Sequence, residues 1–439
     1  MKRLLCAAVA AAVCASAFAS YTIFDGRLSR SSIYPGTTHT YKICVPDSYT
    51  GAEAVPLYVG LDGILCNAPE RIDSLSSLGE IPPMISVYLQ PGYIADTEGN
   101  TVRYNRSNEF DATDGRFAEF LEKELLPSVS NTVLPDGRRI VLSSKPEERM
   151  IFGLSSGGIA AFNAAWQRPD LFGKVYSGCG TFVPMRGGND LQAIVRKHEP
   201  LPLRIFLQDG FTDTWNPIFG SWYEANRVLA SALEFAGYDM DTDWAEGGHS
   251  VVRTSAIFPE VMKWMWRDYP APLATGATGN GLLEQLLLPG EGWTQENLSI
   301  SVAPAELVEA VYPDASLVAV YNPGSNYLDQ YILTPEGDRR FGQRFYWLHT
   351  YDNSALKINS MAFDADGWLW VLTKAGIQIC DQNGRVRGII RLPRGFDAER
   401  GVLRIADGVV TIADPTTQYS RKFNVRAAAG ERPRSQGAA

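Results

Sequence analysis

Short apolar runs and longer amphipathic stretches alternate along the first 270 residues of the chain. Runs rich in β-branched and aromatic residues predict buried strands at residues 41–46, 55–61, 85–90, 149–153, 174–177 and 203–208. Apolar residues at helical spacing predict helices at residues 114–126, where Pro127 is expected to end the helix, and at 159–167, 221–236 and 258–267. Strands that alternate with helices are typical of a mostly parallel sheet covered on both faces, so we expect an α/β fold.

The pattern changes near residue 272. Residues 272–282 are rich in Gly, Ala and Thr and predict a linker. Short strands between Gly-containing turns then predict a smaller all-β domain over residues 283–426. Residues 427–439 have the composition of a disordered tail.

Length and charge support two domains and exclude one function class. The chain has 439 residues, too many for one compact unit at about 100–200 residues per domain, and we assign residues 20–271 to the α/β domain. Asp plus Glu number 49 against 40 Lys plus Arg, a net charge of −9. Because this charge opposes attraction to phosphate backbones and anionic lipids, we do not expect nucleic-acid binding.

Residues 1–19 have the pattern of a secretory signal peptide. Lys2 and Arg3 precede an apolar stretch at residues 4–13, and Ala17-Phe18-Ala19 fits an A-x-A cleavage site. We expect cleavage after Ala19 and a secreted or periplasmic protein. No other run in the sequence reaches the about 18 apolar residues that span a bilayer, so we expect no membrane span.

Cleavage would leave four cysteines, namely Cys44, Cys66, Cys179 and Cys380. An exported protein can form disulfides, and four cysteines allow three full pairings between which the sequence cannot choose. Cys66 and Cys179 flank segments expected near the active site, so one alternative is a disulfide there. Buried free thiols are at least as compatible with the sequence.

The segment Gly153-Leu154-Ser155-Ser156-Gly157 fits the motif G-x-S-x-G. It follows a predicted strand and precedes a predicted helix, and small residues there allow a sharp turn that presents Ser155 at the helix N-terminus. We therefore predict Ser155 as a nucleophile. The alternative is a Gly-rich turn that arose by chance.

A serine hydroxyl needs a neighbouring base to become a nucleophile, and histidine is the usual one. The chain has four histidines. His39 precedes the first core strand, His198 lies in a charged stretch, and His349 lies in the second domain. His249 stands in a Gly-rich loop before the last predicted helix of the α/β domain, which is the chain order of an α/β-hydrolase base. The alternative for His249 is a solvent-exposed turn residue.

The acid that orients His249 is expected in the loop 209–213. Asp213 lies further along this loop and can reach back toward an imidazole, so we prefer it. Asp209 stands at the strand end, where an aspartate often forms a turn, and it is the less favoured candidate.

A tetrahedral intermediate needs two N–H donors aimed at its oxyanion. The first predicted donor is the amide of Ser156, which follows the nucleophile. The second is the amide of Gly63 or Ile64, in the turn after an early strand, although an ordinary β-turn explains this segment equally well. Trp215 and Trp222 follow Asp213 and are candidates to line a cleft for a sugar or aromatic ring, but packing of the helix that follows is the commoner role.

These motifs resemble the Putative esterase family of α/β-hydrolases, which includes enterochelin esterases and family 1 carbohydrate esterases. The resemblance covers about residues 27–270 and is carried by the Ser155 motif and by residues 33–37, 59–63, 105–111, 207–213, 247–250 and 263–270. It implies an ester-hydrolysing triad of Ser155, His249 and an acid in the loop 209–213, with Asp213 the better match. We expect no cofactor and no metal.

Residues 361–371 and 376–386 resemble gluconolactonase-like six-bladed propellers. About 150 residues cannot close six blades of four strands, so the resemblance implies a partial propeller. Asn359-Ser360 stands where that family has an aspartate that holds its metal, so we do not expect lactonase activity.

We therefore expect an exported serine carboxylesterase that removes acetyl or hydroxycinnamoyl groups from carbohydrates. The alternatives are a siderophore esterase and a carbohydrate-binding or scaffolding protein without activity. The sequence identifies no protein partner.

Overall fold

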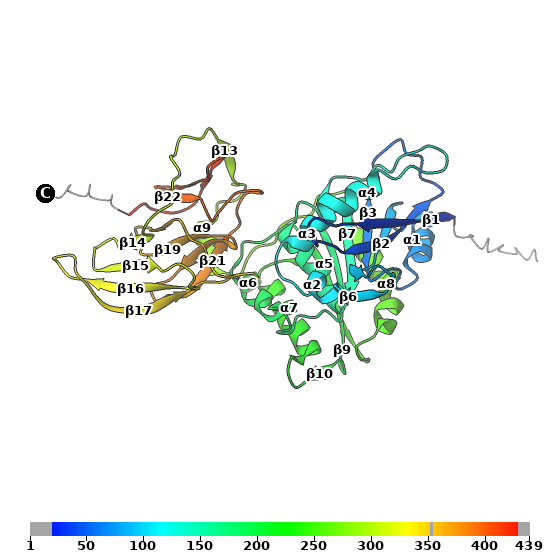
Figure 1. The fold of residues 1–439 in the computed structure, drawn as a ribbon, viewed down its shortest axis with the longest axis horizontal. Coiled ribbons are helices and arrows are strands. Elements are labelled where there is room, and N and C mark those ends of the chain that lie inside the picture. Colours follow the sequence, from blue (N-terminus) through cyan, green and yellow to red (C-terminus); the bar gives the residue numbers. More distant parts are fainter. Residues whose placement is uncertain (1–19, 352–353, 429–439) are drawn as a thin grey trace, which may run out of the picture.

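The computed structural model describes residues 20–351 and 354–428, which form two adjoining lobes (Figure 1). The predicted signal peptide and residues 429–439 of the predicted tail lie outside the described residues. Within the described part of the chain, no helix has the length and apolar character needed to cross a membrane.

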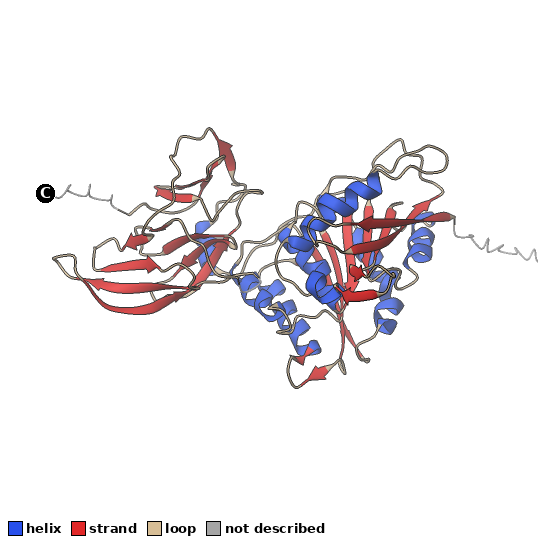
Figure 2. Cartoon of the chain, in the orientation of Figure 1, coloured by secondary structure: helices blue, strands red, loops and turns tan. Residues whose placement is uncertain are grey.

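A ten-stranded sheet forms the centre of the first lobe, with helices around it (Figure 2). Neighbouring strands in one part of it are parallel, in the order β12 (Asp239–Ala245), β9 (Arg204–Gly210), β8 (Lys174–Gly178), β7 (Arg149–Leu154), β3 (Leu57–Leu61) and β4 (Ile85–Leu89). Antiparallel strands extend it beyond β4, namely β2 (Thr38–Pro46), β1 (Tyr21–Ser29), β5 (Tyr93–Ala95) and β6 (Thr101–Tyr104). The predicted α/β fold with a mostly parallel sheet is confirmed.

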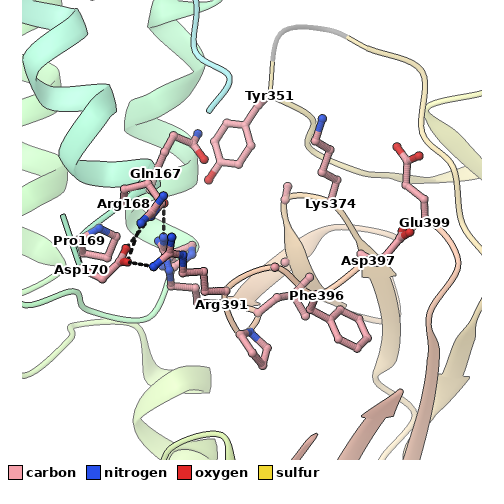
Figure 3. A pocket seen from close by; sticks show the side chains of 18 residues that line it. Gln167, Arg168, Pro169, Asp170, Tyr351, Lys374, Arg391, Phe396, Asp397 and Glu399 are labelled. Atoms are coloured by element: carbon pink, nitrogen blue, oxygen red, sulfur yellow. Dashed lines mark hydrogen bonds and ion pairs between the residues drawn. The ribbon is translucent and has the colours of Figure 1, made fainter. Parts of the chain in front are cut away.

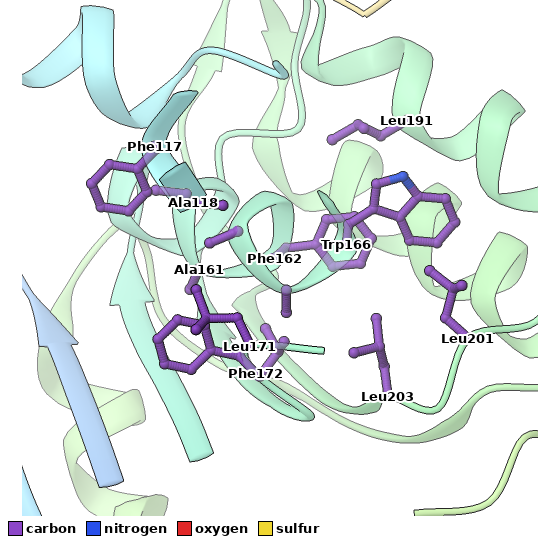
Figure 4. Packing of buried hydrophobic residues seen from close by; sticks show 14 of the residues in the cluster. Phe117, Ala118, Ala161, Phe162, Trp166, Leu171, Phe172, Leu191, Leu201 and Leu203 are labelled. Atoms are coloured by element: carbon purple, nitrogen blue, oxygen red, sulfur yellow. The ribbon is translucent and has the colours of Figure 1, made fainter. Parts of the chain in front are cut away.

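Two apolar layers pack against this sheet. One contains buried residues of α1 (Ala68–Ser77) and α8 (Val251–Trp266). The other contains residues of α3 (Arg116–Phe120), α4 (Leu126–Ser130), α5 (Ser156–Gln167), α6 (Leu191–Lys197) and α7 (Trp222–Phe235). Figure 4 shows Phe162 and Trp166 of α5 inside the second layer, beside Leu201 and Leu203.

Short elements complete the lobe. They are the helix α2 (Arg106–Phe110), the 3-10 turns at Pro146–Glu148 and Gly188–Asp190, and the hairpin of β10 (Trp215–Asn216) and β11 (Gly220–Ser221).

Two predicted helix boundaries are wrong. The helix expected at 114–126 does not end at Pro127, because a π-helical turn at Leu121–Leu125 connects α3 to α4 and Pro127 lies in the first turn of α4. Just before the proline, the Leu126 amide donates to the Leu121 carbonyl five residues back, as in a π-helical turn. The helix expected at 258–267 begins at Val251 and contains Pro259 in its interior.

Within the described residues, the second lobe contains three antiparallel sheets of four strands each. The first has β14 (Glu309–Val311), β15 (Leu317–Tyr321), β16 (Tyr327–Leu333) and β17 (Arg339–Trp347). The second has β18 (Met361–Phe363), β19 (Leu369–Thr373), β20 (Gly376–Cys380) and β21 (Val386–Ile390). The third has β13 (Thr294–Glu296), β24 (Gln418–Lys422), β23 (Val409–Ala413) and β22 (Val402–Ala406). A C-terminal region built of antiparallel sheets is confirmed, whereas its likeness to a propeller stays a prediction.

The predicted linker 272–282 is partly ordered into secondary structure. The helix α9 (Gly281–Leu286) begins inside it, and the Asn280 side chain accepts hydrogen bonds from the amides of Leu282 and Leu283. Further upstream, the Gly279 amide donates to the Phe235 carbonyl at 2.8 Å. This segment therefore packs against the end of α7.

The two lobes dock through apolar and polar contacts. One buried apolar cluster contains residues of both lobes, among them Trp166 and Ile389. Glu199 accepts a hydrogen bond from the Arg391 amide at 2.7 Å and forms an ion pair with Arg421 at 2.8 Å, and both of these charged side chains are 11% exposed. Trp166 donates from its indole nitrogen to the Tyr351 hydroxyl at 3.0 Å.

Cys44, Cys66, Cys179 and Cys380 are all buried free thiols, so the four cysteines of the described residues form no disulfide.

Candidate active site

Ser155 occupies a strained turn between β7 and α5. Its φ of 57° and ψ of −123° are rare for a residue with a side chain. A Cβ atom on Gly153 would collide with the carbonyl of Gly157, and one on Gly157 would lie 2.9 Å from a carboxylate oxygen of Asp62. Gly153 is thus needed for the sharp turn that presents Ser155, and Gly157 leaves room for the Asp62 side chain.

His249 lies in the loop between β12 and α8, within reach of both Ser155 and Asp213. Its Nε2 atom is 2.8 Å from the Ser155 hydroxyl oxygen. Its Nδ1 atom is 2.7 Å and 3.0 Å from the two carboxylate oxygens of Asp213. With the ring proton on Nδ1, His249 donates to Asp213 and accepts from Ser155. The Thr212 amide and hydroxyl both donate to the Gly247 carbonyl, which ties the loop of the acid to the loop of the base.

The two candidate acids have different surroundings. Burial opposes ionisation of Asp213, but hydrogen bonds from His249, Asp209 and the Thr214 amide hold the pKa of Asp213 below its usual value. Burial raises the pKa of Asp209 well above its usual value, and the adjacent Asp213 raises it further. Asp209 accepts hydrogen bonds from the Gly210 amide at 2.7 Å and the Asn226 side chain at 2.9 Å. Asp213 is therefore the carboxylate beside His249, and Asp209 is held by its own loop and by α7 without a hydrogen bond to the imidazole.

The predicted oxyanion donors are only partly available. Ser156 is the first residue of α5, so its amide has no acceptor within the helix. The Gly63 amide donates to the Leu89 carbonyl at 3.0 Å, and this bond occupies the N–H that was predicted to reach an oxyanion. Gly63 is thus corrected to a structural role, which leaves Ile64 as the candidate for the second donor.

A family model described as Putative esterase matches residues 32–269. The chain belongs to this family. The match covers the whole segment from β2 to α8, so this protein is an esterase and the predicted resemblance is confirmed.

Solved structures similar to this esterase include two that are named as esterases and one that is named as a hydrolase. A ferulic acid esterase is 17% identical with a TM-score of 0.42, and the match covers 56% of this chain and 98% of that one. An enterobactin esterase from Shigella flexneri is 21% identical with a TM-score of 0.42, covering 56% of this chain and 59% of that one. An enterobactin and salmochelin hydrolase is 17% identical with a TM-score of 0.40, and the match covers 56% of this chain and 96% of that one. No curated protein matches this chain.

Arg106 is a residue of the esterase site that the sequence analysis did not single out. Its guanidinium donates to both carboxylate oxygens of Asp62, at 2.7 and 2.8 Å, and reaches the Leu154 carbonyl at 3.4 Å. Asp62 has a φ of 63° and directly precedes Gly63 and Ile64. Arg106 thus fastens the loop of the candidate oxyanion donor to the turn that carries the nucleophile. The segment 105–111 was part of the resemblance, but nothing in its spacing indicated this partner.

The two predicted substrate-binding tryptophans differ in exposure. Trp215 lies in the β10–β11 hairpin and is 71% exposed, so it remains available for a ligand. Trp222 is buried at the start of α7, where its indole donates to the Thr181 hydroxyl at 3.2 Å. Its ring centroid lies 6.1 Å from that of His249, so Trp222 packs at the start of α7 beside the base, the role that the sequence analysis gave as the commoner one.

Only one group of His, Cys and acid side chains in the described residues is arranged closely enough for a metal ion, namely Cys179, Asp213 and His249. Two of these side chains already hydrogen-bond to each other. Burial raises the pKa of Cys179, with the nearby aspartates adding to the effect, so its sulfur stays a protonated thiol. A thiol is a poor metal ligand, and the group fits acid–base chemistry better.

Proposed function

We propose that this protein is a serine carboxylic ester hydrolase whose triad is Ser155, His249 and Asp213. The observation that carries the proposal is the unbroken series of hydrogen-bond distances, 2.8 Å from Ser155 to His249 and 2.7 Å from His249 to Asp213. The strained backbone of Ser155 supports the same role, because strain of this kind persists where the surrounding structure holds a reactive group in place.

In this reaction the Ser155 oxygen attacks the ester carbonyl carbon while His249 accepts the hydroxyl proton. The amides of Ser156 and Ile64 donate to the oxyanion that forms. The C–O bond to the alcohol then breaks, and His249 returns its proton to the leaving oxygen. A water molecule, deprotonated by the same imidazole, attacks the acyl-enzyme and releases the acid. Asp213 stabilises the imidazolium at each stage.

The substrate we propose is a carbohydrate that bears acetyl or hydroxycinnamoyl esters, as the sequence resemblance implies. Export, proposed from the pattern of residues 1–19, is compatible with an extracellular polysaccharide substrate. Sequencing the N-terminus of exported protein tests this part, because a start at Ser20 is expected and retention of residues 1–19 would contradict it.

Hydrolysis of an aryl acetate by wild-type protein and by Ser155→Ala tests the activity. We expect the substitution to abolish turnover, whereas Ser231→Ala, which removes an exposed hydroxyl on α7, leaves it unchanged. Equal rates in the wild type and Ser155→Ala would contradict the triad and favour a non-catalytic protein. Faster cleavage of catecholate siderophore esters than of acetylated or feruloylated oligosaccharides would overturn the proposed substrate.

A further inference from the structure

Thr181 lies beside Ser155 and contacts it with both its backbone and its side chain. The Thr181 amide donates to the Ser155 carbonyl at 3.1 Å, and the Thr181 hydroxyl oxygen lies 3.4 Å from the Ser155 hydroxyl oxygen. Thr181 is 2% exposed, in the segment that follows β8. Its buried hydroxyl is therefore a polar neighbour of the nucleophile in addition to His249.

The Trp222 indole determines the direction in which the Thr181 hydroxyl can donate. An indole N–H is a donor and never an acceptor, so the bond of 3.2 Å from Trp222 occupies a lone pair of the threonine oxygen. The hydroxyl hydrogen of Thr181 stays available for Ser155. The Ser155 hydrogen is directed to His249, 2.8 Å away, so the Ser155 oxygen can accept from Thr181.

Helix α7 holds Thr181 in this place. Trp222 and Asn226 are buried one turn apart at the start of α7. The Asn226 side chain donates to the Gly180 carbonyl at 2.8 Å, directly before Thr181. Because the segment is tied to α7 on one side and to the Ser155 carbonyl on the other, the Thr181 hydroxyl is fixed beside the nucleophile.

The distance between the two hydroxyl oxygens suits a bond that strengthens during the reaction. O–H···O bonds are usually about 2.5–3.0 Å long, so a contact of 3.4 Å is weak while Ser155 is neutral. Hydrogen bonds to an ionised oxygen are shorter and about twice as strong. When His249 takes the proton, the Ser155 oxygen gains negative charge and attracts the Thr181 hydrogen more strongly. An interaction that is stronger in the transition state than in the ground state raises kcat.

We propose that Thr181 is a further catalytic residue, which donates a hydrogen bond to the Ser155 oxygen while His249 removes the serine proton. Trp222 is a positioning residue that orients the Thr181 hydroxyl. The O–H bond of Thr181 stays intact, and the proton that moves is the one that passes from Ser155 to His249. When the acyl-enzyme breaks down, the same hydrogen bond stabilises the Ser155 oxygen as it leaves the acyl carbon. This inference rests on the proposed function.

Hydrolysis of an aryl acetate by Thr181→Val tests the proposal, because valine keeps the shape of the side chain and lacks its hydroxyl. We expect kcat and kcat/KM to fall together, about tenfold, as they do when an interaction of the transition state is lost. Thr181→Ser restores a hydroxyl and should stay within about threefold of the wild type. Thermal unfolding shows whether Thr181→Val is folded. If it is not, Thr181→Ala takes its place with the same expected loss.

Thr373→Val is the matched control. Thr373 is a fully buried threonine of the second lobe that likewise accepts a hydrogen bond, from the Gln378 side chain, and donates one, to the Gly376 carbonyl. It precedes Lys374, which lines a cavity of about 720 Å³ between the lobes (Figure 3). That cavity adjoins the end of α5 opposite to Ser155, so Thr373→Val should leave kcat and KM unchanged.

A double-substitution cycle tests the role of Trp222. Trp222→Phe keeps an aromatic ring beside His249 and removes the indole donor. We expect it to lower kcat about threefold in the wild type and to add no loss in Thr181→Val, because Trp222 acts through the Thr181 hydroxyl. The same loss in both backgrounds would overturn the positioning role.

The Ser155→Ala variant separates failure of this inference from failure of the proposed function. If Ser155→Ala is inactive while folded Thr181→Val keeps wild-type kinetics, the role of Thr181 is overturned and the triad stands. An equal loss in Thr181→Ser and Thr181→Val would also overturn it, because the hydroxyl would then not be the group that matters. Activity in Ser155→Ala would instead contradict the triad itself.

Discussion

Strands β3, β4, β8 and β9 of the first lobe bury every residue, as β19 and β20 of the second lobe do, whereas β17 at the edge of a second-lobe sheet exposes seven of its nine residues. The first lobe encloses its sheet between two helical layers, and this rigid surrounding can hold Ser155 at a costly backbone conformation. The open edges and loops of the second lobe are better suited to contacting ligands. The enclosed first lobe therefore suits the reactive serine, and the more open second lobe suits contact with ligands.

The division does not make the lobes independent. Trp166, at the end of the nucleophile helix, is fully buried and contacts the second lobe through Tyr351. Glu199 is covered by Arg391 and Arg421 of the second lobe. Removing the second lobe would expose these groups, so we expect docking to stabilise the first lobe.

The largest expected effect on activity comes from replacing the acid of the proposed triad in the first lobe. We expect Asp213→Asn to lower kcat about 10⁴-fold, because the amide no longer stabilises the imidazolium of His249. Asp209→Asn should keep kcat within about tenfold, because Asp209 hydrogen-bonds to the Gly210 amide and to Asn226 rather than to His249. Kinetics on an aryl acetate measure both. A larger loss in Asp209→Asn would reverse the assignment of the two acids.

A substitution at the interface tests how strongly the lobes stabilise each other. Glu199→Ala leaves Arg421 without its buried partner, and we expect a loss of about 3 kcal/mol in the free energy of unfolding. Denaturant unfolding measures this loss. Turnover under native conditions should persist, since Glu199 has no contact with the triad. An unchanged unfolding midpoint would show that the lobes are energetically independent.

A substitution of Arg106 tests whether its ion pair with Asp62 holds the loop of the candidate oxyanion donor in place. We expect Arg106→Ala to lower kcat about 10²-fold with little change in KM, because the candidate donor Ile64 loses its fixed position. Arg106→Lys should recover only part of the loss, since lysine cannot form the bidentate contact. Arg267→Ala, which breaks a comparable pair with Asp239 away from the site, is the matched control. An effect confined to KM would contradict the positioning role.

The smallest expected effect concerns pH and the interface. Burial, with the nearby Arg391 adding to it, lowers the pKa of His198 to about 3, and burial together with Lys197 lowers that of His349 to about 4. The unfolded chain binds protons at these residues below about pH 6.5 and the folded chain does not, so stability falls as the pH drops from 6.5 toward 4. Urea unfolding between pH 7 and 5 measures the slope. His349→Gln should reduce the slope, and an unchanged slope would contradict its assignment.

Local patterns in the sequence were enough to predict the parts of the site that depend on neighbouring residues. The small residues around Ser155 specify the turn, and the order of strands and loops brings His249 and Asp213 to the same edge of the sheet. By contrast, Arg106 and Asp62 are 44 residues apart and meet only when two loops fold together. The acceptor of the Gly63 amide, Leu89, likewise lies on a neighbouring strand.

Long-range packing also explains the wrong helix boundaries and the unforeseen docking. Pro127 reads locally as a helix end and residue 258 as a helix start, but buried residues on both sides of these positions extend the helices across them. Glu199 and Arg421 are 222 residues apart, and no local pattern links them. A linker composition at 272–282 therefore indicated a boundary in sequence without indicating that the lobes would pack together.

The most direct test of the central claim is covalent labelling of the full chain with a fluorophosphonate, followed by peptide mass spectrometry. The account predicts a single phosphonyl adduct on Ser155, formed much more slowly in His249→Ala and lost in Ser155→Ala. An adduct on another serine, or no adduct on a folded protein, would contradict the assignment of Ser155 as the nucleophile.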